Sequence, residues 1–260
     1  MDLGIKKKRA LVTGSSSGLG EAAATALAAE GALVAINSRN KERLEAAGHR
    51  IHEATGQWPA QIIGDVSKAD DCKRIVEEAA GVDILVSNAG GPPPGQFLDH
   101  GPAKWQEAHD LVLRSATNLT REAMIGMIDR GWGRVIYITS IGVLQPVDTL
   151  ILSNAYRAAV TGMCKTLSNN YAKHGLTFNC VCPGYTATER LKSLAENLAS
   201  QTEGKTADDV IQGFADMAPA GRVGRPNELA SLITFLAGQQ AGYITGASIP
   251  VDGGLYKGLV

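Results

Sequence analysis

The sequence predicts an α/β protein with a doubly wound fold, in which helices cover both faces of a seven-stranded, mostly parallel sheet. Short apolar runs alternate with longer helical patterns from one end of the chain to the other, which is typical of repeated β-α units. Such alternation implies strands that are buried on both faces. With 260 residues, 44% of them hydrophobic, the chain can bury one large core, so we expect a single domain over residues 1–260.

Seven apolar runs are expected to be strands, near Arg9–Thr13, Ala32–Asn37, Ala60–Ile63, Ile84–Ser87, Arg134–Thr139, Thr177–Cys182 and Ser248–Val251. Helices should fill the gaps, near Leu19–Glu30, Lys41–Ala54, Lys68–Ala79, Trp105–Asp129, Asn154–Lys173 and Asn227–Ala237. Pro226 opens the last of these at a first-turn position, where its missing N–H costs nothing.

Two stretches interrupt this alternation. The run Gly90–Gly95 is too rich in proline and glycine for a helix or a central strand, and we expect a rigid loop at the carboxyl edge of the sheet. The segment 186–224 carries apolar residues at helical spacings among charges, namely Leu191, Leu194, Leu198, Ile211, Phe214 and Met217. It is interpreted as a lid of two short amphipathic helices, with ordinary core packing as the alternative.

Composition excludes several classes of function. The formal net charge is -1 and the isoelectric point about 6.5, which gives no electrostatic footprint for nucleic acid. No apolar run is long enough to cross a membrane. The basic cluster Lys6–Arg9 precedes only a short apolar stretch, so we interpret it as a solvated approach to the first strand rather than a targeting element.

The four cysteines, Cys72, Cys164, Cys180 and Cys182, form no C-x-x-C framework, so we expect free thiols in a reducing, cytoplasmic protein. Cys180 and Cys182 should share one face of a strand and pack in the core. The five histidines are scattered without a ligand motif, and no metal is predicted.

A glycine-rich turn follows the first expected strand and opens the first expected helix. It reads Thr13-Gly14-Ser15-Ser16-Ser17-Gly18-Leu19-Gly20. Glycine lets the backbone turn sharply and approach a pyrophosphate, which the free N–H groups and positive dipole end of a helix stabilise. This strand-turn-helix placement predicts a dinucleotide site of the Rossmann type.

The spacing T-G-x-x-x-G-x-G resembles that of the short-chain dehydrogenase/reductase family, and further landmarks follow in order. They are Asp65-Val66 after the third strand, Ser87-Asn88-Ala89-Gly90 after the fourth, Pro183-Gly184 with Thr186 and Thr188, and Thr245-Gly246 with Asp252-Gly253-Gly254. The resemblance spans nearly the whole chain and is nearest to the 3-oxoacyl-carrier-protein reductase branch. It implies that the residues of the glycine turn and these landmarks bind the cofactor: Gly14, Ser16, Ser17, Gly18, Leu19, Gly20, Asp65, Val66, Asn88, Ala89, Gly90, Pro183, Gly184, Thr186 and Thr188.

The end of the second strand indicates which dinucleotide binds. An NAD-preferring site carries a carboxylate there, which bonds the ribose 2′-hydroxyl and repels a 2′-phosphate. This chain has Ser38 and Arg39 instead, and Arg39 can make charge-assisted bonds to the phosphate. NADP(H) is therefore favoured over NAD(H). The alternative is a solvated arginine, since the glycine turn has Ser17 where a second basic residue is often found.

The family resemblance also identifies a catalytic frame, Ser-(x12)-Tyr-x-x-x-Lys, whose residues differ here. Ser140 is followed by Ser153 in the Tyr position and Arg157 in the Lys position, and the run from Arg157 to Gly162 matches the family in the same register. A second register, through Tyr156, would need three extra residues and would put a valine in the Lys position. The supporting Asn of the family falls on Val112.

These replacements change what the site can do. A serine hydroxyl is a far weaker acid than tyrosine, whose pKa of about 10 a nearby cation can lower. Arg157 keeps its proton but can still donate hydrogen bonds to ribose hydroxyls. Three sources of the proton remain open: Ser140 and Ser153 relaying it from water, Tyr185, or Asp148 with a raised pKa.

Two functions follow from the residues and the resemblance. The first is an NADP(H)-dependent oxidoreductase that interconverts a carbonyl and an alcohol, on a 3-oxoacyl-type or other apolar small-molecule substrate, with Ser140 polarising the oxygen. The alternative is a catalytically impaired member that binds the dinucleotide as a sensor or partner subunit. The resemblance further implies a homotetramer packed through the helices near Trp105–Asp129 and Asn154–Lys173.

Overall fold

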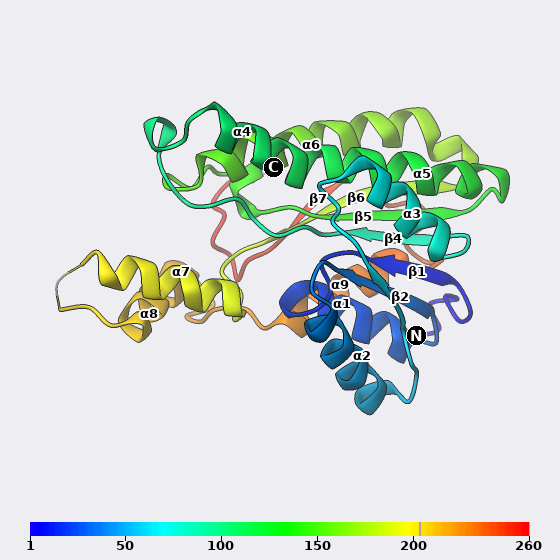
Figure 1. Ribbon diagram of the computed structural model, residues 1–260, viewed down its shortest axis with the longest axis horizontal. Coiled ribbons are helices and arrows are strands. Elements are labelled where there is room, and N and C mark those ends of the chain that lie inside the picture. Colours follow the sequence, from blue (N-terminus) through cyan, green and yellow to red (C-terminus); the bar gives the residue numbers. More distant parts are fainter. Residues whose placement is uncertain (203, 260) are drawn as a thin grey trace.

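The centre of the molecule is a parallel sheet of seven strands in the order β3-β2-β1-β4-β5-β6-β7 (Figure 1). The structure is a computed structural model that describes residues 1–202 and 204–259. The strands are β1 Arg9–Val12, β2 Leu33–Ser38, β3 Ala60–Ile63, β4 Ile84–Ser87, β5 Gly133–Ile138, β6 Leu176–Pro183 and β7 Ser248–Val251. The predicted doubly wound α/β fold is confirmed, with strand bounds within one residue of those expected.

Helices cover both faces of the sheet. One layer contains α1 (Gly18–Ala29), α2 (Lys41–Thr55) and α9 (Pro226–Ala237), and the other contains α3 (Ala69–Glu78), α5 (Ser115–Asp129) and α6 (Ile151–Tyr171). Each layer seals a separate core against the sheet. β1 shows the division, since Val12 points into the first core and Leu11 into the second, both fully buried.

The strand order indicates which edge of the sheet should bind a ligand. The chain runs outward from β1 to β3, then returns to pair β4 with the other side of β1. In open parallel sheets, ligands bind outside the carboxyl ends of the strands at such a reversal. The carboxyl ends of β1 and β4 hold the glycine turn and Asn88, so the topology brings these two predicted cofactor segments together.

One predicted helix differs in detail. The single helix expected near Trp105–Asp129 consists of α4 (Pro102–Ala108), a π-helical segment at His109–Arg114, and α5. Such π segments place an extra residue in a turn and occur frequently near functional sites. The repeated apolar spacing carries no signal of this change, because an inserted residue alters the hydrogen bonding without breaking the amphipathic pattern.

The segment 186–224 forms the two helices that were expected, α7 (Glu189–Ser200) and α8 (Ala207–Met217). They project from the body of the molecule at the left of Figure 1. A short parallel bridge between Thr186 and Gly224 ties the two ends of the segment together. The segment therefore leaves the body of the molecule after β6 and returns to it just before α9.

The four cysteines lie in the interior of the protein, as the sequence predicted for Cys180 and Cys182. The four cysteines are free and buried, and Cys180 and Cys182 share the second core. Burial raises the pKa of Cys182 to about 11, so this thiol stays protonated at neutral pH. Within the described residues, no helix combines the length and apolar character that a membrane span requires.

The first core should depend on Leu236, which lies in α9 and is fully buried against α1 and the sheet. Leu236→Ala is expected to lower the free energy of unfolding by roughly 2–5 kcal/mol, because the cavity it leaves can only partly collapse. Urea denaturation followed by circular dichroism measures this change. Leu98→Ala is the control, since Leu98 is 91% exposed, and an equal loss in both variants would contradict the assignment of the core.

Candidate active site

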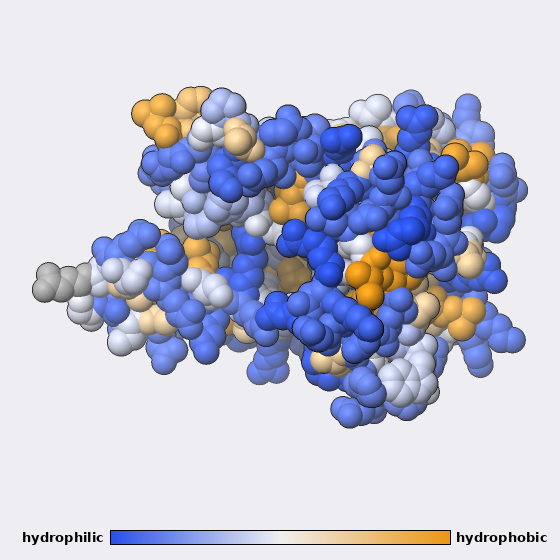
Figure 2. All heavy atoms as spheres, in the orientation of Figure 1, coloured by the Kyte–Doolittle hydropathy of each residue, from blue (hydrophilic) through white to orange (hydrophobic). Residues whose placement is uncertain are grey.

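The predicted site residues meet at one cavity of about 290 Å³, at the carboxyl ends of β1, β4, β5 and β6. Figure 2 shows this face hollowed between the lid helices and the body, with hydrophobic side chains visible inside a hydrophilic rim. The cavity is lined by most of the residues that the sequence identified: Gly14, Ser17, Gly18, Leu19, Asn88, Ala89, Gly90, Ser140, Ser153, Arg157, Pro183, Gly184, Thr186 and Thr188. Ser16 lines an adjoining groove instead.

The glycine turn is held tightly against the end of β4. Asn88 donates from Nδ2 to the Gly14 carbonyl at 3.0 Å, and its backbone exchanges hydrogen bonds with the Thr13 hydroxyl. Gly14 has a φ of +56°, and a methyl group there would lie 2.8 Å from the Asn88 carbonyl oxygen. A methyl group on Gly20 would collide with the Gly14 carbonyl. Glycine is therefore required at both positions by space as well as by conformation.

The first turn of α1 faces the cavity with free N–H groups. Ser17 is the N-cap in extended conformation, yet its side chain makes no capping hydrogen bond. The N–H groups of Gly18 and Leu19 thus have no intrahelical acceptor, and both residues line the cavity. This arrangement fits the pyrophosphate of a dinucleotide, because an anion there accepts N–H bonds and interacts with the positive end of the helix dipole.

The residues expected at the adenosine end lie beside the cavity rather than in its lining. Ser38 and Arg39 close β2, and Asp65 follows β3, the next strand of the sheet. Arg39 is 70% exposed and makes a long ion pair of 3.7 Å with Asp65. The Val66 side chain is buried in the second core with Cys72. Arg39 is therefore a largely solvent-exposed cation near the end of β2.

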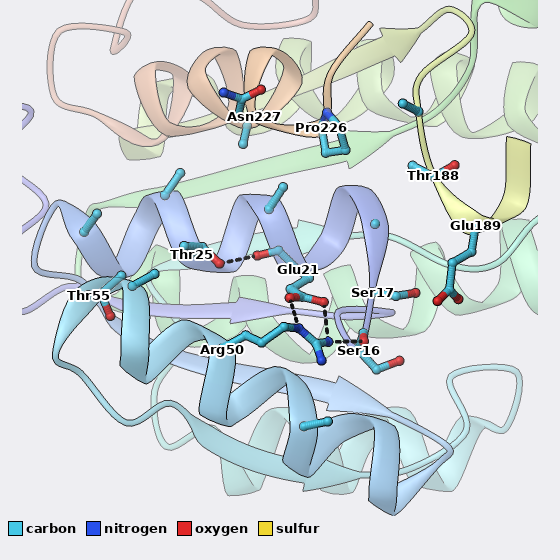
Figure 3. A pocket seen from close by; sticks show the side chains of 18 of the residues that line it. Ser16, Ser17, Glu21, Thr25, Arg50, Thr55, Thr188, Glu189, Pro226 and Asn227 are labelled. Carbon is cyan, nitrogen blue, oxygen red and sulfur yellow. Dashed lines mark hydrogen bonds and ion pairs between the residues drawn. The ribbon is translucent and has the colours of Figure 1, made fainter. Parts of the chain in front are cut away.

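A separate groove of about 920 Å³ runs along α1 between α2 and α9 (Figure 3). Its walls are mainly alanine, serine and threonine side chains. Arg50 of α2 binds Glu21 of α1 at 2.6 Å and reaches the Ser16 carbonyl at 3.3 Å. Arg43 of α2 pairs with Glu189 at the start of the lid, at 3.0 Å. These contacts place two cations near the glycine turn, which the sequence pattern did not indicate because both belong to the polar face of a helix.

The three residues expected to be catalytic, Ser140, Ser153 and Arg157, also line the cavity. Ser140 follows β5, and its Oγ accepts a hydrogen bond from the Gly142 N–H at 3.0 Å, which leaves the hydroxyl proton free to donate. Arg157 of α6 donates from Nε to Ser153 Oγ at 3.2 Å and from Nη1 to the Ile138 carbonyl at 2.7 Å. Ser153 and Arg157 lie one helical turn apart on the face of α6 that lines the cavity.

Burial lowers the pKa of Arg157 to about 10, and the positive charge of Arg190 acts in the same direction. The guanidinium is still charged at neutral pH. It has no carboxylate partner among the residues that the structure describes, and its anchors are a backbone carbonyl and a hydroxyl. Arg157 is therefore a fixed positive charge on the cavity wall and a poor proton donor.

The other candidate residues separate into those at the cavity and those outside it. Tyr156 packs edge-on against Trp105 and His109, with ring centroids 5.8 and 5.7 Å away, and does not line the cavity. Asp148 is exposed and also lies outside the lining, so its candidacy as the acid is not supported by the structure. Tyr185 does line the cavity, where it stacks on Phe214 of the lid at 4.0 Å, and burial raises its pKa.

Val112, which occupies the position of the family's supporting Asn, is buried in the π-helical segment. With Ser115, Thr139 and Arg157 it borders a separate cavity of about 20 Å³. Val112 therefore contributes an apolar side chain to a lining that it shares with Arg157.

The sequence did not indicate the two charged residues that the segment 186–224 contributes to the cavity. Glu189 and Arg190, the first residues of α7, both line the cavity. Arg190 donates from Nη1 to the Gly91 carbonyl at 2.9 Å and from Nη2 to the Pro92 carbonyl at 3.1 Å. A charged residue at the start of an amphipathic helix usually lies in solvent, so only its position two residues after Thr188 could have indicated the contact.

Thr188 links the lid to the site. It is the N-cap of α7, and its side chain accepts from the Leu191 N–H at 3.3 Å. Its methyl group lies against Gly18, where an added Cβ would meet it at 3.4 Å. The lid thus begins directly over the first turn of α1. Among the described residues there is no cluster of three histidine, cysteine or carboxylate side chains that could hold a metal ion.

Comparison with known proteins agrees with this geometry. The family model for enoyl-(acyl carrier protein) reductase matches residues 14–256. The chain is 34% identical to nodulation protein G of Azospirillum brasilense, over 96% of this chain and 99% of that protein. It is also 34% identical to the acetoacetyl-CoA reductase of Rhizobium meliloti, over 95% and 98% of the two chains.

Solved structures show the same fold over the whole length. L-sorbose reductase of Gluconobacter frateurii, in complex with NADPH and L-sorbose, superposes with a TM-score of 0.94 at 34% identity, over 100% of both chains. Actinorhodin polyketide ketoreductase with NADPH gives a TM-score of 0.92 at 29% identity, over 97% and 98% of the chains. The chain therefore belongs to the short-chain dehydrogenase/reductase family and is an oxidoreductase of that family.

Proposed function

We propose that this protein is an NADP(H)-dependent oxidoreductase that interconverts a carbonyl and an alcohol without a tyrosine at the family's usual acid position. One observation carries the proposal: the free N–H groups of α1 and the Ser140 hydroxyl open onto the same cavity. The first can hold a dinucleotide phosphate and the second can bond a substrate oxygen. The reductase structures that superpose on this chain with bound NADPH support the pairing.

The residues present fit the cofactor from one end to the other. The first turn of α1 would hold the pyrophosphate, and Asn88 would keep the glycine turn in place beneath it. Arg157 would donate hydrogen bonds to the nicotinamide ribose hydroxyls. This role needs a fixed cation but no transfer of its proton. When bound, the cofactor supplies or accepts the hydride, and the protein orients it and excludes water.

Preference for the 2′-phosphate would come from the end of β2. Ser38 and Arg39 offer a hydroxyl and a largely exposed guanidinium, and the 3.7 Å pair with Asp65 is long and solvated. A phosphate dianion can displace such a pair, because it binds a guanidinium through two parallel charge-assisted bonds.

The substrate oxygen would lie between the two serine hydroxyls. Ser140 Oγ accepts from Gly142 and Ser153 Oγ accepts from Arg157, so each hydroxyl can still donate its own proton to a hydrogen bond. Two O–H donors aimed at one oxygen stabilise the negative charge that forms there. Neither is acidic enough to give up its proton outright, so we propose that water bound to them supplies it. Tyr185 on the lid is the second candidate for this step.

Arg39→Ala is expected to weaken NADPH binding by about ten-fold or more and to leave NADH binding unchanged, because only the 2′-phosphate would lose a charged partner. Fluorescence titration with both dinucleotides measures the two dissociation constants. Arg130→Ala is a matched control, since Arg130 is also partly exposed and paired with a carboxylate, Asp83, which precedes β4 at the opposite edge of the sheet. Equal NADPH affinity in both variants would remove Arg39 from the site.

Ser140→Ala should lower kcat for NADPH oxidation by about 10²- to 10³-fold, the usual loss when one donor to a developing oxyanion is removed. NADPH affinity should not change, because Ser140 bonds the substrate oxygen and not the cofactor. Stopped-flow absorbance and equilibrium titration measure the two quantities. Turnover that survives Ser140→Ala unchanged would exclude the proposed role.

The double substitution Ser153→Tyr with Arg157→Lys restores the family's acid and should raise kcat by about 10²- to 10⁴-fold. Steady-state NADPH oxidation against a panel of ketones and 3-oxoacyl thioesters measures it. Tyr156→Phe is the control and should change nothing, since that ring packs on Trp105 and His109. Tight NADPH binding by the native protein with no turnover on any compound would instead favour an impaired member that acts as a sensor or partner subunit.

A further inference from the structure

Two arginines from different helices line the cavity, and the described residues provide neither with a carboxylate within 4.0 Å. Arg157 comes from α6 and Arg190 from the lid helix α7. Their hydrogen bonds go to the Ile138, Gly91 and Pro92 carbonyls and to the Ser153 hydroxyl. Elsewhere in the described chain, arginines commonly pair with carboxylates within 4.0 Å, as do Arg39, Arg43, Arg50, Arg74, Arg114, Arg130 and Arg222.

The cavity therefore holds uncompensated positive charge. Glu189 is the carboxylate in its lining, but this side chain is 69% exposed and pairs with Arg43 on the outer side. The two cations are close enough for Arg190 to contribute to the lowered pKa of Arg157. Bringing like charges together in a partly desolvated space costs free energy, and an anion bound beside either guanidinium would lower that cost.

The Arg190 guanidinium packs closely against the loop at Gly91 and Pro92. Its guanidinium lies directly over Gly91, and a methyl group at that position would collide with the guanidinium carbon and nitrogens. Two of its five N–H groups donate to loop carbonyls, which leaves the others available to a ligand. A guanidinium with free N–H groups can bind a carboxylate through charge-assisted hydrogen bonds.

The lining also includes four aliphatic side chains, Val147, Leu150, Leu191 and Leu194. We infer that the substrate is a small oxo acid or hydroxy acid, whose carboxylate binds Arg190 while its reacting oxygen lies at Ser140. The inference rests on the proposed function and names its substrate class. In the direction of reduction, the carbonyl carbon gains the hydride that the cofactor supplies. The C=O π electrons move to oxygen, which takes a proton from water, so that oxo acid, NADPH and a proton become hydroxy acid and NADP⁺.

Turnover of oxo acids beside their neutral esters tests the inference. Pyruvate, acetoacetate and levulinate, each with its ethyl ester, vary the distance between carbonyl and carboxylate. We expect kcat/KM for at least one acid to exceed that of its ester by about ten-fold or more, the usual effect of a charge-assisted hydrogen bond. Acetoacetyl-CoA is the third arm, and a preference for it over both would assign the charge to the phosphates of a coenzyme and overturn the inference.

Variants locate the effect. Arg190→Met should remove the acid preference by lowering kcat/KM for the acid about ten-fold more than kcat/KM for the ester, and Arg190→Lys should restore part of the preference. Gly91→Ala should weaken the preference without changing any charge, because it displaces the guanidinium. Arg43→Met is the matched control: it removes an arginine that also contacts the lid but does not line the cavity, so the preference should remain. Equal effects of Arg43→Met and Arg190→Met would contradict the inference.

A binding measurement separates this inference from the proposed function. Calorimetric titration of butanoate and of butanamide into the NADP⁺ complex reports the anion site without turnover. Butanoate should bind about ten-fold tighter or more, and Arg190→Met should remove the difference. Carboxylate binding without NADPH oxidation would support the anion site and remove the reductase function. Turnover of ketones with equal binding of acid and amide would do the reverse.

Discussion

The site depends on the contact between the glycine turn and the end of β4. Asn88 bonds the Gly14 carbonyl, and neither Gly14 nor Gly20 has room for a side chain. This contact crosses the point where the strand order of the sheet reverses, so it fixes the first turn of α1 relative to β5 and α6. The free N–H groups of α1 and the serine hydroxyls can line one cavity because this contact holds the glycine turn against the end of β4.

The cavity contains positively charged groups and hydroxyl groups, but neither kind is an effective acid near neutral pH. The fixed positive charges, Arg157 and Arg190, cannot act as acids near neutral pH, and the hydroxyls of Ser140 and Ser153 are too weak to do so. The site can therefore hold and polarise a substrate oxygen more readily than it can protonate it. A substrate with its own negative charge would gain most from this arrangement, because the two guanidiniums have no other anion to bind among the described residues.

The sequence predicted the scaffold well and the active site less completely. Strand positions followed from continuous apolar runs, and the glycine turn from its place between a strand and a helix. The two short helices between residues 186 and 224 were also predictable, because their apolar residues recur at helical spacings. Arg190 was not, because its role depends on where α7 lies relative to the Gly91 loop, and that packing leaves no periodic signal. The π-helical segment was not predicted either, because it changes backbone hydrogen bonds without changing the apolar spacing.

The central claim is that this reductase site works without a titrating acid, and the pH dependence of kcat for NADPH oxidation tests it most directly. Arg157, with a pKa lowered to about 10, keeps its charge below that pH, and the serine hydroxyls do not titrate. Burial raises the pKa of Tyr185, so this side chain also stays neutral. The account predicts a flat profile from roughly pH 6 to pH 9. A step or a bell within that range would show that an ionising acid supplies the proton, and would contradict the account.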